Sequence, residues 1–493
     1  MWILFKKLPL VISIPTIFVL MMMIPALHGF YVGNEHQGRT FLYAVLLGLF
    51  ALGFISLLLQ DEMPSLRRHS QLFSIFIFFL GFPIVMAIPF HEVMPSEHII
   101  NSYLDLVSVF TTTGLPVFPD NVLNETIVIW RVCIGWTSGF LIWVFAWSVF
   151  AQLNLSRVDN LTAADSESGF NKSQAQANLR LSTEKFWREV ARFGPIYFWI
   201  TAGTALSLLV VSGDPVFSIL RAMSTIATFG AKIPGDTGVG WPSEVILFLV
   251  MIFALSRITF CRPFTKSWKH IFFKDHELRL AVILIILAVI ILIIVGWSEN
   301  IQIWRSTELI WGLFFTSMSF LTTTGLSSIY IPDSLVGLGK AGVVFSALAI
   351  IGGGVATTAG GLKLLRVYIL ARHCKMEVDS LIAPSQIRKG QDFNNSINYP
   401  NAMLACVFLI LFILVFAAIT LGLALNGSEV GEALSLTLAT LTNTGPLAQG
   451  LSDSENTILE LGIRAKLILV FAMVFGRMEV LALLVLLNPD IYR

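Results

Sequence analysis

Four short turns rich in threonine and glycine interrupt an otherwise apolar sequence. They read TTTG at 111–114, TIATFG at 225–230, TTTG at 322–325 and TNTG at 442–445. A dehydrated cation needs a ring of oxygens, which backbone carbonyls supply where the chain bends toward a shared axis. Glycine permits backbone angles closed to other residues, and a threonine hydroxyl can hold the turn or face the ion. Four turns together predict a pseudo-fourfold cation-binding ring; the alternative is threonine-rich packing between helices.

Each turn ends a short helical pattern and precedes a long apolar run. The short patterns cover 102–113, 214–228, 306–324 and 428–444, and each first residue suits an N-cap. None is long enough to cross a bilayer, and irregular backbone at membrane depth is tolerated where it lines a water-filled cavity. The predicted unit is therefore a helix, a re-entrant half-helix with its turn, and a second helix, repeated four times.

The composition indicates a membrane protein. Hydrophobic residues make up 56% of the chain and charged residues only 13%, whereas soluble domains carry about a quarter. Apolar runs of about 20 residues, enough to span a bilayer, give about ten predicted helices. They lie near 8–28, 40–59, 72–90, 127–153, 193–212, 244–260, 280–297, 338–370, 402–425 and 463–487. The net charge of +1 offers no argument for nucleic-acid binding.

Lysine and arginine gather on one side of these spans. They lie in the N-terminal segment and in three linkers at 156–190, 263–278 and 373–399, whereas the opposite side is richer in acids. By the positive-inside rule the linkers and both termini are cytoplasmic, and all four turns face outward.

A second irregular stretch and one buried charge fall inside predicted spans. Five glycines occur within 352–361, too many for a regular helix. The alternative for this stretch is a close-packing face between helices. Arg477 lies in the last span, where a charge is a functional hypothesis because its burial is costly. A structural tie between helices is the alternative for Arg477.

Other candidate features argue against catalysis. Asp105, Asp214, Glu308 and Glu432 lie ahead of the turns, where we expect them to stabilise the half-helices as N-terminal acids. The four cysteines have no metal-ligand spacing, and no ATP-binding, HExxH or GxSxG motif is present. We therefore expect no enzyme activity and no organic cofactor.

The motifs resemble those of the Trk/Ktr/HKT superfamily of cation transporters, most closely the TrkH/TrkG-type potassium-uptake membrane subunits. The resemblance covers nearly the whole chain. It rests on the four turns, on GGGVATTAGGLK at 352–363 and on GRME at 476–479. It implies an all-α polytopic membrane protein in which a two-helix preamble precedes four helix–half-helix–helix repeats around a central pore.

The resemblance also implies residue roles. The potassium filter would comprise Thr112, Thr113, Gly114, Thr228, Phe229, Gly230, Thr323, Thr324, Gly325, Asn443, Thr444 and Gly445. The gate would comprise Gly352, Gly353, Gly354, Thr357, Thr358, Gly360, Gly361 and Arg477. The second turn departs from the Gly-Gly pair typical of Trk members. Either Gly230 or Phe229 then occupies the filter position, and we favour Gly230 because a β-carbon on the axis would be crowded.

The expected domain boundaries follow the repeats. The preamble covers 1–68, and the four pore repeats cover 69–155, 191–262, 279–372 and 400–493, separated by the three linkers. The resemblance implies potassium uptake across the bacterial inner membrane by a homodimer in contact with membrane lipid. It also implies a cytoplasmic TrkA-type nucleotide-binding regulatory subunit. The alternatives are a sodium-permeable or poorly selective relative and, more remotely, a secondary transporter of an organic solute.

Overall fold

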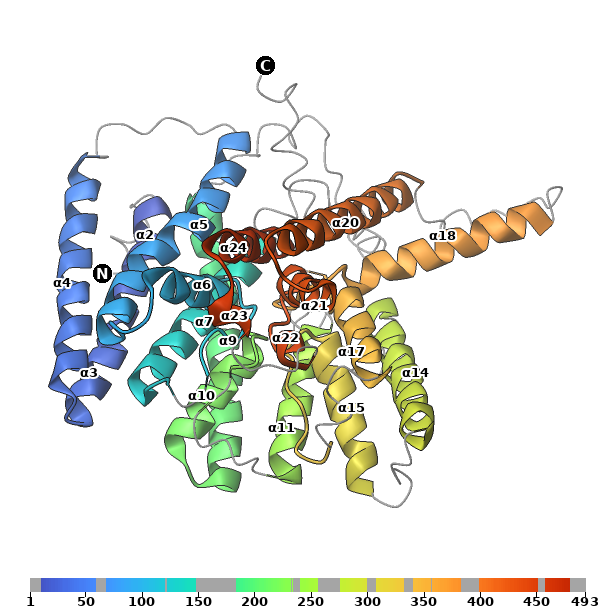
Figure 1. Cartoon of the computed structure of the whole chain (residues 1–493), viewed down its shortest axis with the longest axis horizontal. Helices are drawn as coiled ribbons and strands as arrows, with labels where there is room; N and C mark the ends of the chain where they lie inside the picture. The colour runs from blue at the N-terminus through green and yellow to red at the C-terminus, as the bar shows by residue number, and fades with distance from the viewer. Residues whose placement is uncertain are drawn as a thin grey trace.

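The computed structural model is a bundle of α-helices arranged around a central axis (Figure 1). It describes residues 10–58, 68–119, 122–147, 183–231, 233, 240–255, 275–298, 307–331, 340–355, 357–382, 399–450 and 457–478. Among these residues there is no β-strand. Seven helices are long and apolar enough to cross a membrane, and six shorter apolar helices accompany them in the same described segments. The predicted all-α membrane fold is confirmed.

A preamble and four repeats follow one another along the chain. The preamble consists of α2 (Leu10–Met21), α3 (Met23–Tyr31) and α4 (Glu35–Leu58). The first repeat consists of α5 (Arg68–Val93), α6 (Ile99–Phe110) and α7 (Glu125–Phe145). The second consists of α9 (Thr183–Ser212), α10 (Pro215–Ile226) and α11 (Trp241–Met251), which a short 3₁₀ turn extends to Ala254.

The third repeat consists of α14 (His276–Ser298), α15 (Thr307–Leu321), α17 (Lys340–Ile351) and α18 (Leu364–Ile382). The fourth consists of α20 (Tyr399–Leu425), α21 (Val430–Leu441), α22 (Leu447–Gly450), α23 (Thr457–Glu460) and α24 (Ile463–Arg477). The helices α6, α10, α15 and α21 are the four half-helices. Each ends at the residue before a four-residue turn, which in the second repeat covers 227–230, because the second residue of each turn leaves helical backbone angles.

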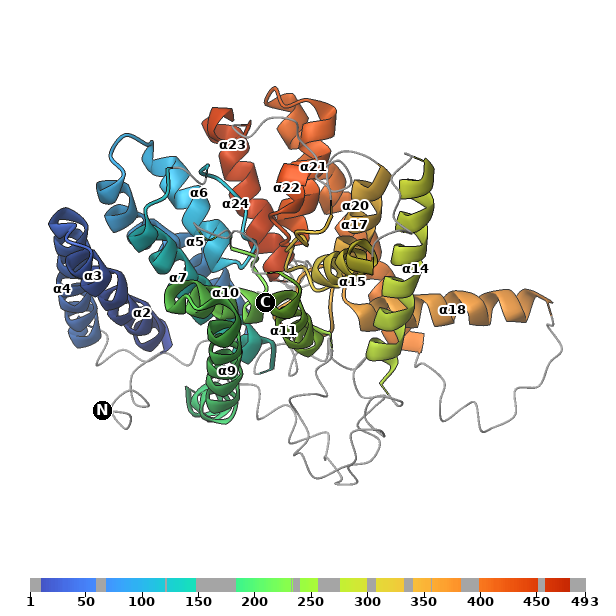
Figure 2. The same ribbon diagram turned by 90° about the horizontal axis from the view of Figure 1, so that it is seen from below.

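The repeats form a closed circuit rather than a row. Helix α10 packs on α7, α11 on α15, and α17 on α22, which joins each repeat to the next. Helix α24 then packs on α6, which joins the fourth repeat back to the first (Figure 2). The preamble lies outside this circuit, where α2 and α3 contact α7 and α4 contacts α5.

Two expectations about helix starts differ from the structure. Asp214 caps α10 as predicted, with its carboxylate accepting from the amides of Val216 and Phe217 at 2.9 and 3.2 Å. Helix α6 instead begins before Ser102, at Ile99, and its N-cap is His98, whose ring accepts from the Ile100 amide. Helix α21 has Glu429, not Ser428, at its N-cap. Both serines suit an N-cap by local propensity. Helix α6 nevertheless starts about one turn earlier than predicted, and α21 starts one residue later.

Asp105 is not an N-terminal acid. It lies in the middle of α6, fully buried, and its carboxylate pairs with Arg131 of α7 at 2.9 Å. Two opposite charges buried together stabilise each other only as a pair, and removing one costs about 3–5 kcal/mol. Asp105 therefore locks the first half-helix to the next helix of its repeat.

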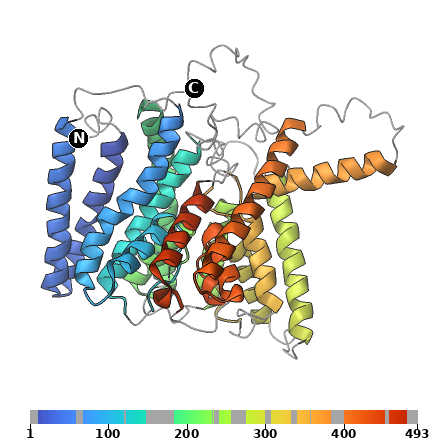
Figure 3. The same ribbon diagram turned by 45° about the horizontal axis from the view of Figure 1, so that its top comes forward.

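The interruption predicted at 352–361 is present, since α17 ends at Ile351 and α18 begins at Leu364. Most of the three linkers lies outside the described residues. Where they are described, α9 begins inside the first predicted linker and α18 continues to Ile382, inside the third. The far half of α18 projects away from the bundle (Figure 3).

Candidate functional site

The four turns share one backbone conformation. Its signature is a left-handed residue that is not glycine, at the second position of each turn. Thr112, Thr228, Thr323 and Asn443 have φ of 52°, 55°, 57° and 54°. Left-handed backbone is uncommon for such residues. Its recurrence within a few degrees in all four turns indicates one structural requirement rather than four accidents.

Backbone hydrogen bonds fix the register between the turns. In each turn the third residue donates its amide to the carbonyl five residues earlier. The bonds run from Thr113 to Ser108 (2.8 Å), Phe229 to Ser224 (3.2 Å), Thr324 to Ser319 (2.9 Å) and Thr444 to Ala439 (2.8 Å). Phe229 therefore corresponds to Thr113, and Gly230 corresponds to Gly114. The second turn thus keeps its glycine at the same position as the other three.

The last residue of each turn touches the neighbouring turn. A β-carbon on Gly114 would lie 1.8 Å from the carbonyl oxygen of Phe229, and one on Gly230 would lie 2.0 Å from that of Thr324. A β-carbon on Gly325 would lie 2.7 Å from the ring of Pro446, and one on Gly445 would lie 2.3 Å from the carbonyl carbon of Gly114. The four glycines thus close a ring in the order first, second, third, fourth, first, in which no side chain fits.

Direct hydrogen bonds strengthen the closure between the fourth and first turns. Gly445 donates its amide to the carbonyl of Thr113 at 2.7 Å. The side-chain amide of Asn443 donates to the Thr113 hydroxyl at 2.9 Å and to the Met473 carbonyl at 3.0 Å. Asn443 and Thr113 are 330 residues apart in the sequence, so only the repeat pattern indicated that they would meet.

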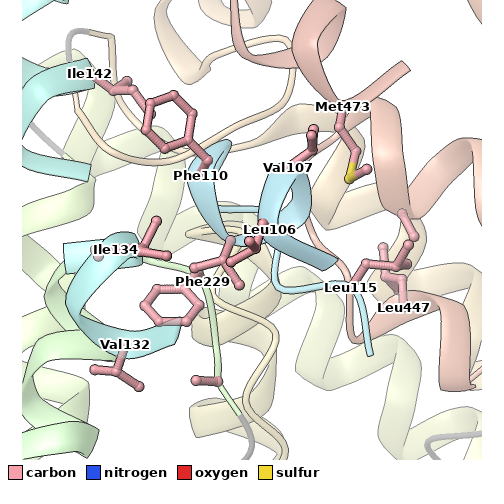
Figure 4. Packing of buried hydrophobic residues seen from close by; sticks show 14 of the residues in the cluster. Leu106, Val107, Phe110, Leu115, Val132, Ile134, Ile142, Phe229, Leu447 and Met473 are labelled. Carbon is pink, nitrogen blue, oxygen red and sulfur yellow. The ribbon is translucent and has the colours of Figure 1, made fainter. Parts of the chain in front are cut away.

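Threonine hydroxyls brace three of the turns internally. Those of Thr111 and Thr113 lie 2.8 Å apart, those of Thr322 and Thr324 3.0 Å apart, and those of Thr442 and Thr444 3.2 Å apart. The second turn has Ala227 and Phe229 at these positions and no such pair. The Phe229 ring is instead buried beside Val132 and Ile134 of α7 (Figure 4).

The glycine-rich loop at 352–361 lies against the turns. Thr228 donates its hydroxyl to the Thr358 carbonyl at 2.9 Å, and the Gly360 amide donates to the Thr323 hydroxyl at 2.7 Å. A β-carbon on Gly360 would lie 2.0 Å from the carbonyl of Thr442. The loop therefore contacts the second, third and fourth turns. Arg477 of α24 donates to the same Thr358 carbonyl at 2.5 Å, which brings the predicted gate residues together.

Two buried oxygens at the left-handed positions have no hydrogen-bond partner among the described residues. They are Oγ1 of Thr112 and Oδ1 of Asn443. The corresponding hydroxyls of Thr228 and Thr323 are used by the glycine-rich loop. A buried oxygen without a partner is costly unless water or a cation satisfies it. In the described segments no three His, Cys, Asp or Glu residues gather around a metal site.

Two residues that support the site, Glu244 and Lys466, are not among those predicted from the sequence. Glu244 of α11 is buried and accepts from the Ser328 hydroxyl at 2.7 Å, the Ile329 amide at 3.1 Å and the Trp311 indole at 2.9 Å. Lys466 of α24 reaches Asn101 of α6 at 2.7 Å. Glu244 holds the second repeat to the third, and Lys466 holds the fourth to the first. Lys466 is a charge inside the predicted span 463–487, which is a sequence signal of the same kind as Arg477, whereas Glu244 stands at the first residue of its span.

The chain is similar to known cation transport proteins. The model of the TrkH family, described as cation transport protein, matches residues 245–490. The chain is 27% identical over 445 residues to the Trk system potassium uptake protein TrkH of Salmonella typhimurium, covering 88% of each. It is 26% identical over 462 residues to an uncharacterized cation transporter of Methanocaldococcus jannaschii, covering 92% of this chain and 89% of that one.

The chain belongs to the TrkH family of cation transport proteins. The fold extends the likeness over the whole length. The crystal structure of the potassium transporter TrkH from Vibrio parahaemolyticus superposes with a TM-score of 0.78, covering 99% of this chain and 100% of that one at 21% identity. The TrkH match includes the third and fourth turns, the glycine-rich loop and Arg477; the first two turns precede the family-model match.

Proposed function

We propose that this TrkH-family protein carries potassium ions into the cell through a pore. The four turns form its selectivity filter, and the glycine-rich loop with Arg477 forms its gate. The observation that carries the proposal is the closed ring of four turns, each with a left-handed residue two positions before its glycine, in which each glycine abuts the next turn. Carbonyl rings replace the hydration shell of a potassium ion in filters of this kind.

The filter residues have separate tasks in this proposal. The carbonyls of the turns coordinate the ion, and the glycines let the four backbones approach the axis. The free oxygens of Thr112 and Asn443 add ligands at the inner end. The four half-helices end at the turns, so the negative ends of their dipoles favour a cation there.

The gate follows from the contacts below the ring. The Thr358 carbonyl accepts from both Thr228 and Arg477, which keeps the loop against the turns. The Arg477 guanidinium places a positive charge on the path of a cation leaving the filter. Opening requires the loop to leave these contacts, after which the ion descends its electrochemical gradient.

The test is rubidium uptake and potassium-limited growth in a bacterial strain that lacks its own potassium-uptake systems. Intact protein is expected to support both, with potassium preferred over sodium. Gly114→Ser is expected to lose that preference, because its β-carbon would collide with the Phe229 carbonyl. Arg477→Ala is expected to raise uptake several-fold, since a hydrogen bond to a charged group is worth about 1.5–3 kcal/mol. The matched control is Arg464→Ala, an exposed arginine on the same helix.

The outcomes separate the alternatives. Sodium competing equally with potassium in the intact protein would favour the poorly selective relative. Unchanged uptake in Arg477→Ala would remove the gate and keep the transporter. Absence of uptake by protein present in the membrane would contradict the proposal, provided that a co-expressed regulatory subunit does not restore it.

We further infer the assembly and the orientation from the family. The protein is a homodimer in the bacterial inner membrane, its termini are cytoplasmic, and a TrkA-type nucleotide-binding subunit docks on its cytoplasmic face. Crosslinking in membranes tests the dimer, and co-purification tests the subunit. Labelling of a cysteine added at either terminus, from each side of sealed vesicles, tests the orientation.

A further inference from the structure

The glycine-rich loop has a second set of contacts, which do not involve Arg477. Two consecutive amides, those of Gly354 and Val355, donate outward to other helices. Gly354 donates to the Ala254 carbonyl at 3.1 Å, and Val355 donates to the Glu277 carboxylate at 3.2 Å. The mechanism proposed above uses neither acceptor.

The two acceptors belong to the two sides of one connection in the chain. Ala254 ends the 3₁₀ turn after α11, and Glu277 lies in the first turn of α14. The chain between them is the connection from the second repeat to the third. One short stretch of the loop is therefore bonded to both ends of that connection.

The geometry at both acceptors is tight. A β-carbon on Gly353 would lie 2.8 Å from the Ala254 carbonyl oxygen, so the loop backbone packs directly on the end of α11. The Glu277 residue is 4% exposed, and its own amide donates to the Asp275 carboxylate at 2.9 Å. That bond caps the start of α14 and fixes the backbone from which the Glu277 side chain reaches the loop.

We propose that Glu277 is a positioning residue for the glycine-rich loop, which it holds against the turns through Val355, whereas Arg477 bonds the loop at Thr358. This proposal rests on the gating role given to the loop above. The loop is then held between two groups. Arg477 draws in the Thr358 carbonyl, and Glu277, with the Ala254 carbonyl, draws in the amides of Gly354 and Val355. A shift of the end of α11 or of the start of α14 therefore moves one of the loop's acceptors directly.

The required property of residue 277 is an oxygen that accepts the Val355 amide. Glu277→Gln keeps such an oxygen and removes the charge, whereas Glu277→Ala removes the acceptor. The amide of Val355 would then lose the carboxylate that accepts it, and the loop would leave its place more often. We expect exchange of the loop amides to rise about tenfold in Glu277→Ala, in line with the weight of a hydrogen bond to a charged group.

The experiment is hydrogen–deuterium exchange of the intact protein in lipid nanodiscs, followed over 352–361, with rubidium uptake measured on the same variants. Glu277→Ala is expected to exchange faster in the loop and to take up rubidium several-fold faster, while Glu277→Gln stays close to the unmodified protein. The control is Glu35→Ala, which removes a carboxylate that pairs with Arg39 in the preamble, away from the loop. It should leave exchange at 352–361 unchanged.

The two readouts keep this proposal distinct from the transport function. Unchanged loop exchange in a folded Glu277→Ala variant would overturn it, whatever the uptake. Equal effects of Glu277→Gln and Glu277→Ala would also overturn it, because charge and not the hydrogen bond would then matter. If the unmodified protein transports nothing, the transport proposal fails, and the exchange experiment still decides whether Glu277 positions the loop. Unchanged melting temperatures and unchanged exchange in α6 exclude general unfolding as the cause.

Discussion

The second turn and the other three reach one backbone conformation by different means. The first, third and fourth turns brace themselves from within, through a pair of threonine hydroxyls. The second has Ala227 and Phe229 instead, and its brace is a buried aromatic ring lying on Gly135 of α7, where an added β-carbon would lie 2.5 Å from it. Each of the four turns therefore needs the same left-handed residue and the glycine that contacts the next turn. The support of a turn can come either from its own hydroxyl pair or from packing against a neighbouring repeat.

Gly230→Ala is expected to reduce uptake more than the other substitutions, because it disrupts the contact between a glycine and the next turn that all four turns share. The new β-carbon would lie 2.0 Å from the Thr324 carbonyl, in a residue whose φ is 50°. The turns would have to separate, so rubidium uptake should fall by about a hundredfold or more, the equivalent of about 2.7 kcal/mol. The control is Gly203→Ala in α9, which has open space around it and should behave normally. Normal uptake by Gly230→Ala would remove the glycine ring from the mechanism.

Phe229→Ala is the next largest, and it separates the second turn from the others. Deleting a fully buried phenylalanine costs about 3–5 kcal/mol of folding free energy. We expect a lower melting temperature and a reduced preference for potassium over sodium. Phe229→Leu fills most of the same space and should lose less of both. If Phe229→Ala lowered the melting temperature and the potassium preference no more than Thr322→Val does, the idea that packing of Phe229 supports the second turn would be contradicted.

Thr322→Val is expected to be the mildest. It deletes one hydroxyl pair while keeping shape, and a neutral hydrogen bond is worth about 1 kcal/mol, or a change of about fivefold in the potassium preference. In the second turn, Ala227→Ser should restore nothing, because residue 229 offers no hydroxyl to meet it. Ion competition during rubidium uptake measures both. A gain of potassium preference in Ala227→Ser would mean that the second turn also depends on polar bracing.

The sequence was enough to predict what repeats. Four similar turns after four short helical patterns predicted the re-entrant unit, and the glycine at the end of each turn located the ring positions. The second turn could be aligned only from its backbone bonds, because Phe229 and Gly230 both fitted the pattern by spacing alone. The break at 352–361 was visible because glycine opposes helix formation wherever it occurs in such numbers.

What the sequence did not predict is the pairing of side chains on helices that are distant in the sequence. Asp105 looked like a helix-starting acid, yet it pairs with Arg131, 26 residues away. Glu244 and Glu277 looked like ordinary residues near helix ends, yet each accepts a backbone amide of the third repeat across roughly eighty residues of chain. Such partners depend on how the helices are arranged around the axis, and no local pattern contains that information.

The closed ring also limits how the four copies can drift apart. In an open array of repeats the last copy contacts only one neighbour. Here every turn contacts two neighbouring turns, because the fourth turn contacts the first. A change that lengthens one turn therefore requires compensating changes in the neighbouring turns. The second turn diverged at Ala227 and Phe229, the positions that brace a turn, and not at Gly230. Within this chain the four turns therefore differ at the positions that support a turn and share glycine at the positions that contact the next turn.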